Sequence, residues 1–310
     1  MTVKRPIQIR LGGYGPSTTG FSQGLRQIGD RLSDAFGSDV EVKHVYNILD
    51  LGYRSEDILW LVEHGLLTLG YQSTSYFTPH VPELGMLDLP FVFQERDKAR
   101  ALMDGELGQT LAARMEQRMA YRVLGYFENG FRHISNRLRP IQTPADIVGQ
   151  RIRVLPSKVQ ARTFELLGAI PLIWDLADVL EGVAAGTLDA QENPLANTVT
   201  YGVHKFHRFH SLTSHSYLSR PIFVHRPSFD QLPDDMQMVL RNAVQEAVRV
   251  QRALAIEEEA AARAEIIEEG GEIYEPSDKN IAAFRKAIAP IYDEARQSYD
   301  QKLLSLLPTF

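Results

Sequence analysis

The sequence predicts an α/β protein whose parallel sheet is covered by helices on both faces. Short apolar segments with strand-like alternation, such as Ile7–Leu11, precede segments whose apolar residues recur at helical spacing, such as Thr19–Phe36. The same order returns in the middle of the chain, and strands that alternate with helices are typical of a parallel sheet. With 310 residues, the chain has the length of two ordinary domains.

The first 70 residues carry this pattern most clearly. Gly12–Pro16 forms a turn after the first strand, and Gly37 stops the first helix. The helical face of that segment consists of Phe21, Leu25, Ile28, Leu32 and Phe36. The expected elements are strand 7–11, helix 19–36, strand 40–45, helix 55–65 and buried strand 66–70.

The middle of the chain predicts further alternation. Thr143–Asp146 has the residues of a helix start, because Thr caps, Pro suits the first position and Asp supplies the acid of a capping box. Gly149 closes this single turn. The expected elements are strand 121–126 leading to Gly130, strand 151–155, helix 156–167, helix 176–185 and strand 187–190.

The last third predicts an unusually long helix. The pattern from Pro233 to Glu269 contains no helix breaker and exceeds the usual length of a globular helix. Its second half around Glu257–Arg263 is polar on most faces, so we expect part of it to bridge two domains in solvent. A final helix is expected over about 279–307.

Composition and charge exclude several functions. The net charge of −6 argues against a nucleic-acid partner, and the absence of cysteine excludes disulfides and cysteine-ligated zinc. No apolar run approaches the roughly 18 residues that span a bilayer. The segment Met1–Pro6 is not followed by an apolar stretch, so no secretory signal peptide is expected in the chain as given. This leaves a cytoplasmic protein or a chain of mature length.

The main candidate for ligand binding is Arg153. Arg151 and Arg153 share one face of a strand that should be buried, and Arg153 lies toward the carboxyl end, where α/β sheets bind ligands. Burying an unpaired guanidinium costs several kcal/mol, so Arg153 needs a fixed partner or a ligand. A guanidinium can grip a carboxylate with two hydrogen bonds. A structural salt bridge explains the arginine equally well.

Other candidates have a structural explanation beside a functional one. The loop Gly12–Pro16 lacks a dinucleotide or phosphate-loop motif, and Tyr14 either faces a ligand or belongs to a tight turn. Trp174 is a core residue or a pocket wall. Four histidines do not share a helix face or have an acidic neighbour, so surface or hinge positions are expected rather than a metal site: His204, His207, His210 and His215.

No enzyme signature is present in the sequence. The Gly-x-Ser-x-Gly, His-Glu-x-x-His and cysteine nucleophile motifs are missing, and Asp234 with Asp235 is explained by helix capping. The sequence therefore predicts a protein that holds an organic anion, without catalytic residues, metal or cofactor.

Several motifs spread over most of the chain carry a family resemblance. They are Pro82–Phe91, Gly130–Asn136, Arg139–Asp146, Gly149–Val154, Gly168–Pro171, Gly186–Pro194 and Leu232–Gln237. Together they resemble the solute-binding proteins of TRAP transporters, of the dicarboxylate-binding (DctP) type. One departure is Ala190, where the family usually has glycine.

The resemblance implies a two-lobed, periplasmic-binding-protein-like α/β fold, with a ligand cleft between the lobes and a long helix crossing both. Lobe I would comprise residues 1–129 and about 218–257, and lobe II residues 130–217 and about 258–310, joined by a hinge. Arg153 matches the arginine that clamps the carboxylate, and Arg132 a second arginine lining the cleft. The other expected ligand-binding residues are Asn193, Tyr14, Gln72, Tyr76, Trp174 and Leu176.

The function implied by the resemblance is periplasmic capture of a small organic acid and its delivery to the membrane permease subunits of a TRAP transporter. The protein itself is not expected to be embedded in the membrane. A ligand with a hydrophobic body is expected rather than a heavily hydroxylated sugar acid. Two alternatives stay open: a sensing protein that uses the same cleft for signalling, and an α/β enzyme acting on a carboxylate.

Overall fold

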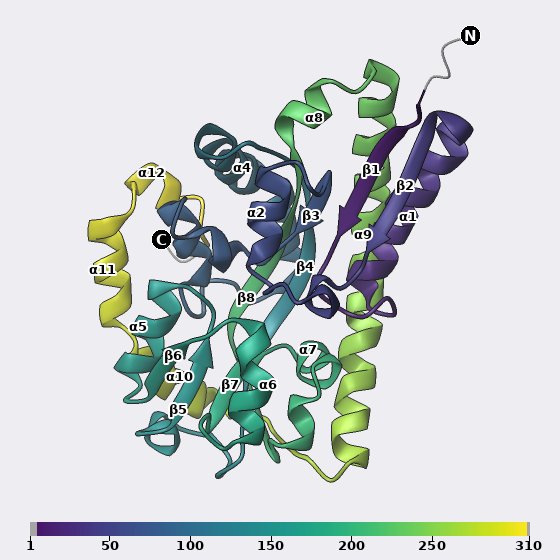
Figure 1. The fold of residues 1–310 in the computed structure, drawn as a ribbon. Helices are drawn as coiled ribbons and strands as arrows, with labels where there is room; N and C mark the ends of the chain where they lie inside the picture. The colour runs from purple at the N-terminus through teal and green to yellow at the C-terminus, as the bar shows by residue number, and fades with distance from the viewer. Residues whose placement is uncertain (1–4, 309–310) are drawn as a thin grey trace. The chain divides into compact units, whose positions relative to one another are not determined.

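A computed structural model of the chain describes residues 5–308 (Figure 1). Most of the segment on which the signal-peptide expectation depends lies outside this range. The described chain divides into two compact units. Unit 1 contains the chain through Gln72, Ala112–Glu128 and Arg220–Ile256, and unit 2 contains Ser73–Leu111, Asn129–Ser219 and the chain from Glu257 onward.

This division differs from the expected lobes at residues 73–111, which cluster with unit 2. The physical reason is a buried hydrogen-bond network. The Asp88 carboxylate accepts hydrogen bonds from Ser75 at 2.7 Å and from Gln160 at 3.0 Å, which joins this segment to the helix of Gln160. The two lobes and their hinge stay a prediction.

The sheet of unit 1 has the strand order β2-β1-β3-β8. The strands β1 (Ile7–Gly12), β2 (Val40–Val45) and β3 (Leu69–Tyr71) are parallel. The second half of β8 (Phe209–His225) is antiparallel to β3. Strands β1 and β2 lie where their alternating apolar residues predict them.

The helices of unit 1 include α1 (Gly20–Phe36), whose first turn is capped by the hydroxyl of Thr19. Its predicted apolar stripe is buried except at Phe36. Figure 1 shows α1 beside the first part of α9 (Asp234–Glu268), and Arg31 joins the two helices through an ion pair with Glu246 at 2.8 Å. The remaining helices are α2 (Asp57–Glu63) and α8 (Arg226–Asp230), and α4 (Glu106–Arg118) enters the unit from unit 2.

The strands of unit 2 follow the order β4-β7-β5-β6. The end of β4 (Tyr121–Asn136) is antiparallel to β7 (Ala190–Asn193), which is parallel to β5 (Arg151–Val154). At the edge, β6 (Ile170–Ile173) is parallel to β5, while β9 (Glu272–Tyr274) pairs with the first half of β8.

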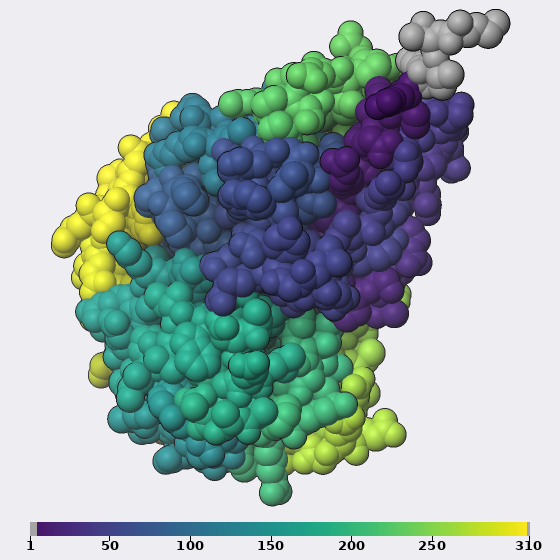
Figure 2. All heavy atoms as spheres, viewed as in Figure 1, coloured from purple at the N-terminus to yellow at the C-terminus, as the bar shows by residue number. Residues whose placement is uncertain are grey.

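The helices of unit 2 include α5, whose N-terminus is capped by Ser157. In Figure 2, the yellow C-terminal segment lies against teal residues of the same unit, and Arg162 of α5 pairs with Glu294 of α11 at 2.9 Å. The bounds are α3 (Arg96–Asp104), α5 (Lys158–Leu166), α6 (Leu176–Ala184), α7 (Leu195–Thr200), α10 (Asp278–Ala287), α11 (Pro290–Ser298) and α12 (Gln301–Leu304).

One expected strand is longer than predicted, and two other expected elements are wrong. The strand predicted at 121–126 does not stop before Gly130 but continues to Asn136, with Gly130 at a φ of +96° that favours glycine. The strand predicted at 187–190 begins at Ala190, because the amides of Thr187 and Leu188 hydrogen bond back to Gly182. The single helix predicted over 279–307 is three helices, α10 to α12.

The long helix is confirmed: α9 runs for 35 residues from Asp234 to Glu268. Among the described residues, no helix combines the length and the apolar character that a membrane crossing requires.

Candidate functional site

Arg153 is buried on β5 of unit 2, with only 2% of the residue exposed. Its Nε donates to the backbone carbonyl of Trp174 at 2.9 Å, which fixes the plane of the guanidinium. One terminal nitrogen lies 3.4 Å from the Tyr76 hydroxyl. Within residues 5–308, no carboxylate lies at ion-pair distance from Arg153. A buried cation therefore has two oriented polar neighbours and no counter-charge.

The neighbouring Arg151 contrasts with Arg153. Its guanidinium makes two hydrogen bonds of 2.9 Å to the Asp189 carboxylate, which also accepts from Arg137 at 2.6 Å. Hydrogen bonding from Arg151 lowers the pKa of Asp189. The salt-bridge explanation therefore applies to Arg151, whereas the described contacts of Arg153 include no carboxylate.

Tyr76 belongs to a short 3-10 segment, Thr74–Phe77, and is buried. Its hydroxyl lies 3.5 Å from the Asp175 carboxylate and also faces Arg153. Asp175 caps α6 by accepting from the amide of Ala177 at 2.9 Å. The start of α6 and the arginine on β5 are thus linked through one tyrosine.

Trp174 and Leu176 follow the edge strand β6. The Trp174 carbonyl holds Arg153, while its half-buried ring packs against a core cluster of Val179, Val183, Leu188 and Val203. Leu176 is buried as the first residue of α6. Trp174 therefore contacts the core through its ring and Arg153 through its backbone carbonyl.

We expect Gly182→Ala to disturb this arrangement, because a methyl group at Gly182 would overlap the Trp174 ring. Overpacking typically lowers the free energy of unfolding by about 1–3 kcal/mol, and the better helix propensity of alanine offsets up to about 1 kcal/mol of this loss. Chemical denaturation should show a net loss of about 1–2 kcal/mol. A variant more stable than the wild type would contradict the packing of Trp174 on α6.

Asn193 ends β7 and is buried. Its Oδ1 accepts a hydrogen bond from Nδ2 of Asn197 at 3.2 Å, and the same amide also donates to Asn129 at 2.9 Å. The side-chain carbonyl of Asn193 is therefore used by the hydrogen bond from Asn197. The NH2 group of Asn193 is then the part that can donate to an anion.

Arg132 lies inside β4 and contacts a buried acid. Its Nε and one terminal nitrogen donate to the Glu192 carboxylate, and that terminal nitrogen also donates to the Glu192 carbonyl at 2.6 Å. Both residues are almost completely buried, and His215 lies 3.4 Å from the same carboxylate. Burial is the largest single influence and would raise the pKa of Glu192, but the charges and hydrogen bonds of Arg132 and His215 together outweigh it, so the pKa is lowered. The described contacts of Arg132 are therefore with protein.

The two remaining candidates, Tyr14 and Gln72, belong to unit 1. Tyr14 is buried against Tyr71, and the Arg220 guanidinium lies 5.1 Å from its ring centre. Gln72 donates to the carbonyl of Ser55 at 2.6 Å. Close packing explains the glycine at position 13 of the loop Gly12–Pro16, because a Cβ there would lie 2.8 Å from the carbonyl oxygen of Tyr46.

Sequence reasoning missed several buried polar residues. Glu192 lies in the motif Gly186–Pro194, directly before Asn193. A single acidic residue in a buried strand needs a positively charged partner, and this need predicts an arginine nearby. Arg220 lies 4.0 Å from the ring centre of Phe21 and stands just before the apolar residues Ile222–Val224, without a recognisable motif. Asp88 is buried among the side chains of Ser75 and Gln160.

Asp88 makes the stability of the protein depend on pH, because burial raises the pKa of its carboxyl to about 6. The folded state then holds a proton between about pH 4 and 6 that the unfolded chain releases. The stability contributed by this proton is present below about pH 4 and is lost as the pH rises through 6. As the pH rises from about 4 to 6, we expect the free energy of unfolding of the wild type to fall relative to that of Asp88→Asn in denaturation experiments. A constant difference would contradict the raised pKa.

The four histidines, for which surface or hinge positions were expected, do not lie at the surface. His204, His207, His210 and His215 are all buried. Burial lowers the pKa of His207 to about 3 and that of His210 to about 4, so both are neutral at pH 7. His210 and His215 lie on β8, a strand that the sequence analysis did not predict.

Comparison with known proteins identifies the family. The model of "bacterial extracellular solute-binding protein, family 7" (DctP) matches residues 25–298. A solute-binding protein of Verminephrobacter eiseniae is 29% identical over 279 residues, covering 87% of this chain and 82% of that protein. The 2,3-diketo-L-gulonate-binding periplasmic protein YiaO of Escherichia coli is 32% identical over 198 residues, covering 64% of this chain and 60% of YiaO.

Solved structures show the same fold. A TRAP periplasmic solute-binding protein of Chromohalobacter salexigens with bound D-glucuronate has a TM-score of 0.90 at 26% identity, covering 96% of this chain and 97% of that one. A counterpart from Sulfurospirillum deleyianum with bound succinate has the same TM-score, identity and coverage. These proteins are two-lobed α/β proteins. The chain belongs to family 7 of the bacterial extracellular solute-binding proteins, the DctP family.

Proposed function

We propose that this protein captures a small organic acid by its carboxylate and that Arg153 is the clamp. The observation that carries the proposal is the buried Arg153 guanidinium, which is oriented by the Trp174 carbonyl and has no carboxylate partner among residues 5–308. A bound carboxylate supplies the missing charge through two parallel hydrogen bonds. Asn193 adds an amide donor, and Tyr76 adds a hydroxyl.

The chemistry of related ligands supports a carboxylate. The relatives of known structure hold D-glucuronate, succinate and D-erythronate, whose bodies differ in size and hydroxylation. The group they share is the carboxylate. Several of these ligands are hydroxylated, so both sugar acids and acids with an apolar body belong among the compounds to test.

Arg132 has a supporting role in this proposal. Its contacts with Glu192 hold β4 to β7, and β7 ends with Asn193. The pair thus positions the amide that faces the ligand. Contributions of Leu176, Tyr14 and Gln72 to binding stay predictions, to be tested by single substitutions.

The proposed setting is the periplasm, with delivery of the ligand to the membrane permease subunits of a TRAP transporter. Family membership supports this setting and favours transport over sensing or catalysis. Reconstituted permease subunits should take up the acid only in the presence of this protein. Uptake that does not depend on the protein would contradict the transport proposal.

A thermal-shift screen tests the binding proposal. The panel should contain sugar acids, succinate, pantoate and aromatic acids, with neutral sugars and nucleotides as controls. A ligand at 100 times its dissociation constant adds about 2.7 kcal/mol of stability. We expect only carboxylates to raise the melting temperature. Stabilisation by neutral sugars or nucleotides alone would overturn the proposal.

A further inference from the structure

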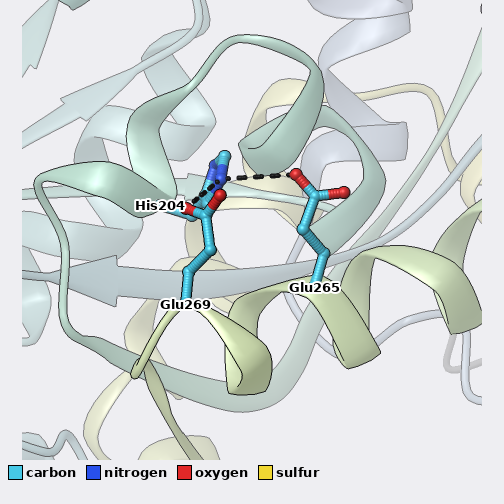
Figure 3. Close-up of side chains that lie close together, drawn as sticks. All are labelled: His204, Glu265 and Glu269. Atoms are coloured by element: carbon cyan, nitrogen blue, oxygen red, sulfur yellow. Dashed lines mark ion pairs between the residues drawn. The ribbon is translucent and has the colours of Figure 1, made fainter.

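Three side chains of unit 2 converge at the end of α9. His204 belongs to the short 3-10 segment Val203–Lys205. Glu265 lies in the last turn of α9, and Glu269 follows one helical turn later, directly after the helix. Figure 3 shows both carboxylates directed toward the imidazole. The His204 Nε2 atom lies 3.0 Å from Glu269 and 3.6 Å from Glu265, and one ligand atom from each residue lies within 4.8 Å of the others.

A backbone contact at Nδ1 orients the imidazole of His204. Only 2% of its side chain is exposed, and Nδ1 lies 3.4 Å from the backbone carbonyl of Thr198. A carbonyl only accepts hydrogen bonds, so Nδ1 is the nitrogen that donates to Thr198, and Nε2 is the nitrogen left to bind a metal ion. Nε2 is buried without a hydrogen-bond partner among the described residues. Nε2 faces the carboxylate oxygens of Glu265 and Glu269, which is an arrangement that a cation stabilises.

The charges at this end of α9 also favour a cation. Glu265 and Glu269 are like charges at i and i+4, and they lie at the negative end of the helix dipole. The last turn of α9 contains no basic residue. The nearby arginines have other partners, since Arg208 pairs with Glu272 and Arg263 pairs with Glu275.

The geometry suits a tetrahedral ion. Zinc bonds of about 2.0–2.1 Å to nitrogen and oxygen place neighbouring ligand atoms about 3.3 Å apart. The two distances from Nε2, 3.0 and 3.6 Å, lie on either side of that value. One imidazole with two carboxylates suits zinc better than calcium or magnesium, which prefer oxygen ligands. Both carboxylates are close to half-exposed, so an ion can enter from solvent.

We propose that His204, Glu265 and Glu269 bind one divalent transition-metal ion, with zinc preferred and water completing its coordination. The ion ties the end of α9 to the segment Val203–Lys205 within unit 2. None of the three residues belongs to the proposed carboxylate site. The metal site and the proposed function can therefore be tested separately.

Zinc titration of the tag-free protein after chelator treatment tests this site. We expect one zinc per chain, with a raised melting temperature, and cobalt(II) should give the visible spectrum of a tetrahedral nitrogen–oxygen site. Glu265→Gln and Glu269→Gln should each weaken zinc binding by about tenfold or more. Their side chains are partly exposed, so these variants should fold even if His204→Gln, which alters a buried side chain, does not.

Glu268→Gln is the matched control, because it removes the same charge from the last turn of α9 without removing a proposed ligand. It should bind zinc as the wild type does. The proposal is overturned if the wild type takes up no zinc, since the cluster is then an ion pair only. Equal losses in Glu268→Gln and Glu265→Gln would also overturn it, because they would indicate nonspecific attraction by the acidic helix end.

Discussion

Arg153→Ala is expected to weaken binding of the cognate acid strongly. Removing one partner of a buried, hydrogen-bonded charge pair costs about 2–5 kcal/mol, and a ligand of micromolar affinity is bound by about 8 kcal/mol in total. The dissociation constant should therefore rise about 30-fold or more in calorimetric titrations. Normal binding by this variant would show that Arg153 is not the clamp.

A pair of lysine variants gives the matched control. Arg153→Lys keeps the charge but loses the planar fork, so binding should still weaken. Arg151→Lys makes the same change two residues away on β5, at a side chain that already pairs with Asp189. It should retain ligand affinity. Equal effects of the two variants would indicate a general disturbance of β5 rather than loss of a specific contact.

Glu192→Ala is expected to have the largest effect on stability. The variant leaves the Arg132 guanidinium buried without its counter-charge, and breaking a buried pair in this way costs about 3–5 kcal/mol. Denaturant unfolding at neutral pH measures the loss. Glu272→Ala is the control, because its ion pair with Arg208 lies at the surface and is worth at most about 1 kcal/mol.

The double variant Arg132→Met, Glu192→Leu separates a charge effect from a packing effect. Replacing a buried ion pair by apolar side chains of similar volume is often neutral or stabilising. The double variant should therefore be more stable than Glu192→Ala. If it is less stable, the pair matters through its shape and hydrogen bonds rather than through the cost of an unpaired charge.

The fold was predictable where one residue pattern decides the local structure. Strands β1 and β2 alternate, α1 has one apolar stripe ending at Gly37, and α9 contains no helix breaker. The elements that were missed depend on tertiary contacts. The polar strand β7 is stable in the core because Arg132 neutralises Glu192, and that partner lies 60 residues away.

The site was predictable in its residue types but not in its pairings. The sequence placed Arg151 and Arg153 on one strand face with a ligand or a salt bridge as equal explanations. Only the structure shows that Asp189 pairs with Arg151. Similarly, Glu265 and Glu269 meet His204 only because the fold brings the end of α9 against Val203–Lys205.

The central claim is that Arg153 recognises the carboxylate itself. The most direct measurement is calorimetric titration of the wild type with the best acid from the screen and with its neutral methyl ester. We expect the acid to bind, the ester to bind at least about 30-fold more weakly, and this preference to disappear in Arg153→Ala. Equal affinity of the wild type for acid and ester would contradict the account.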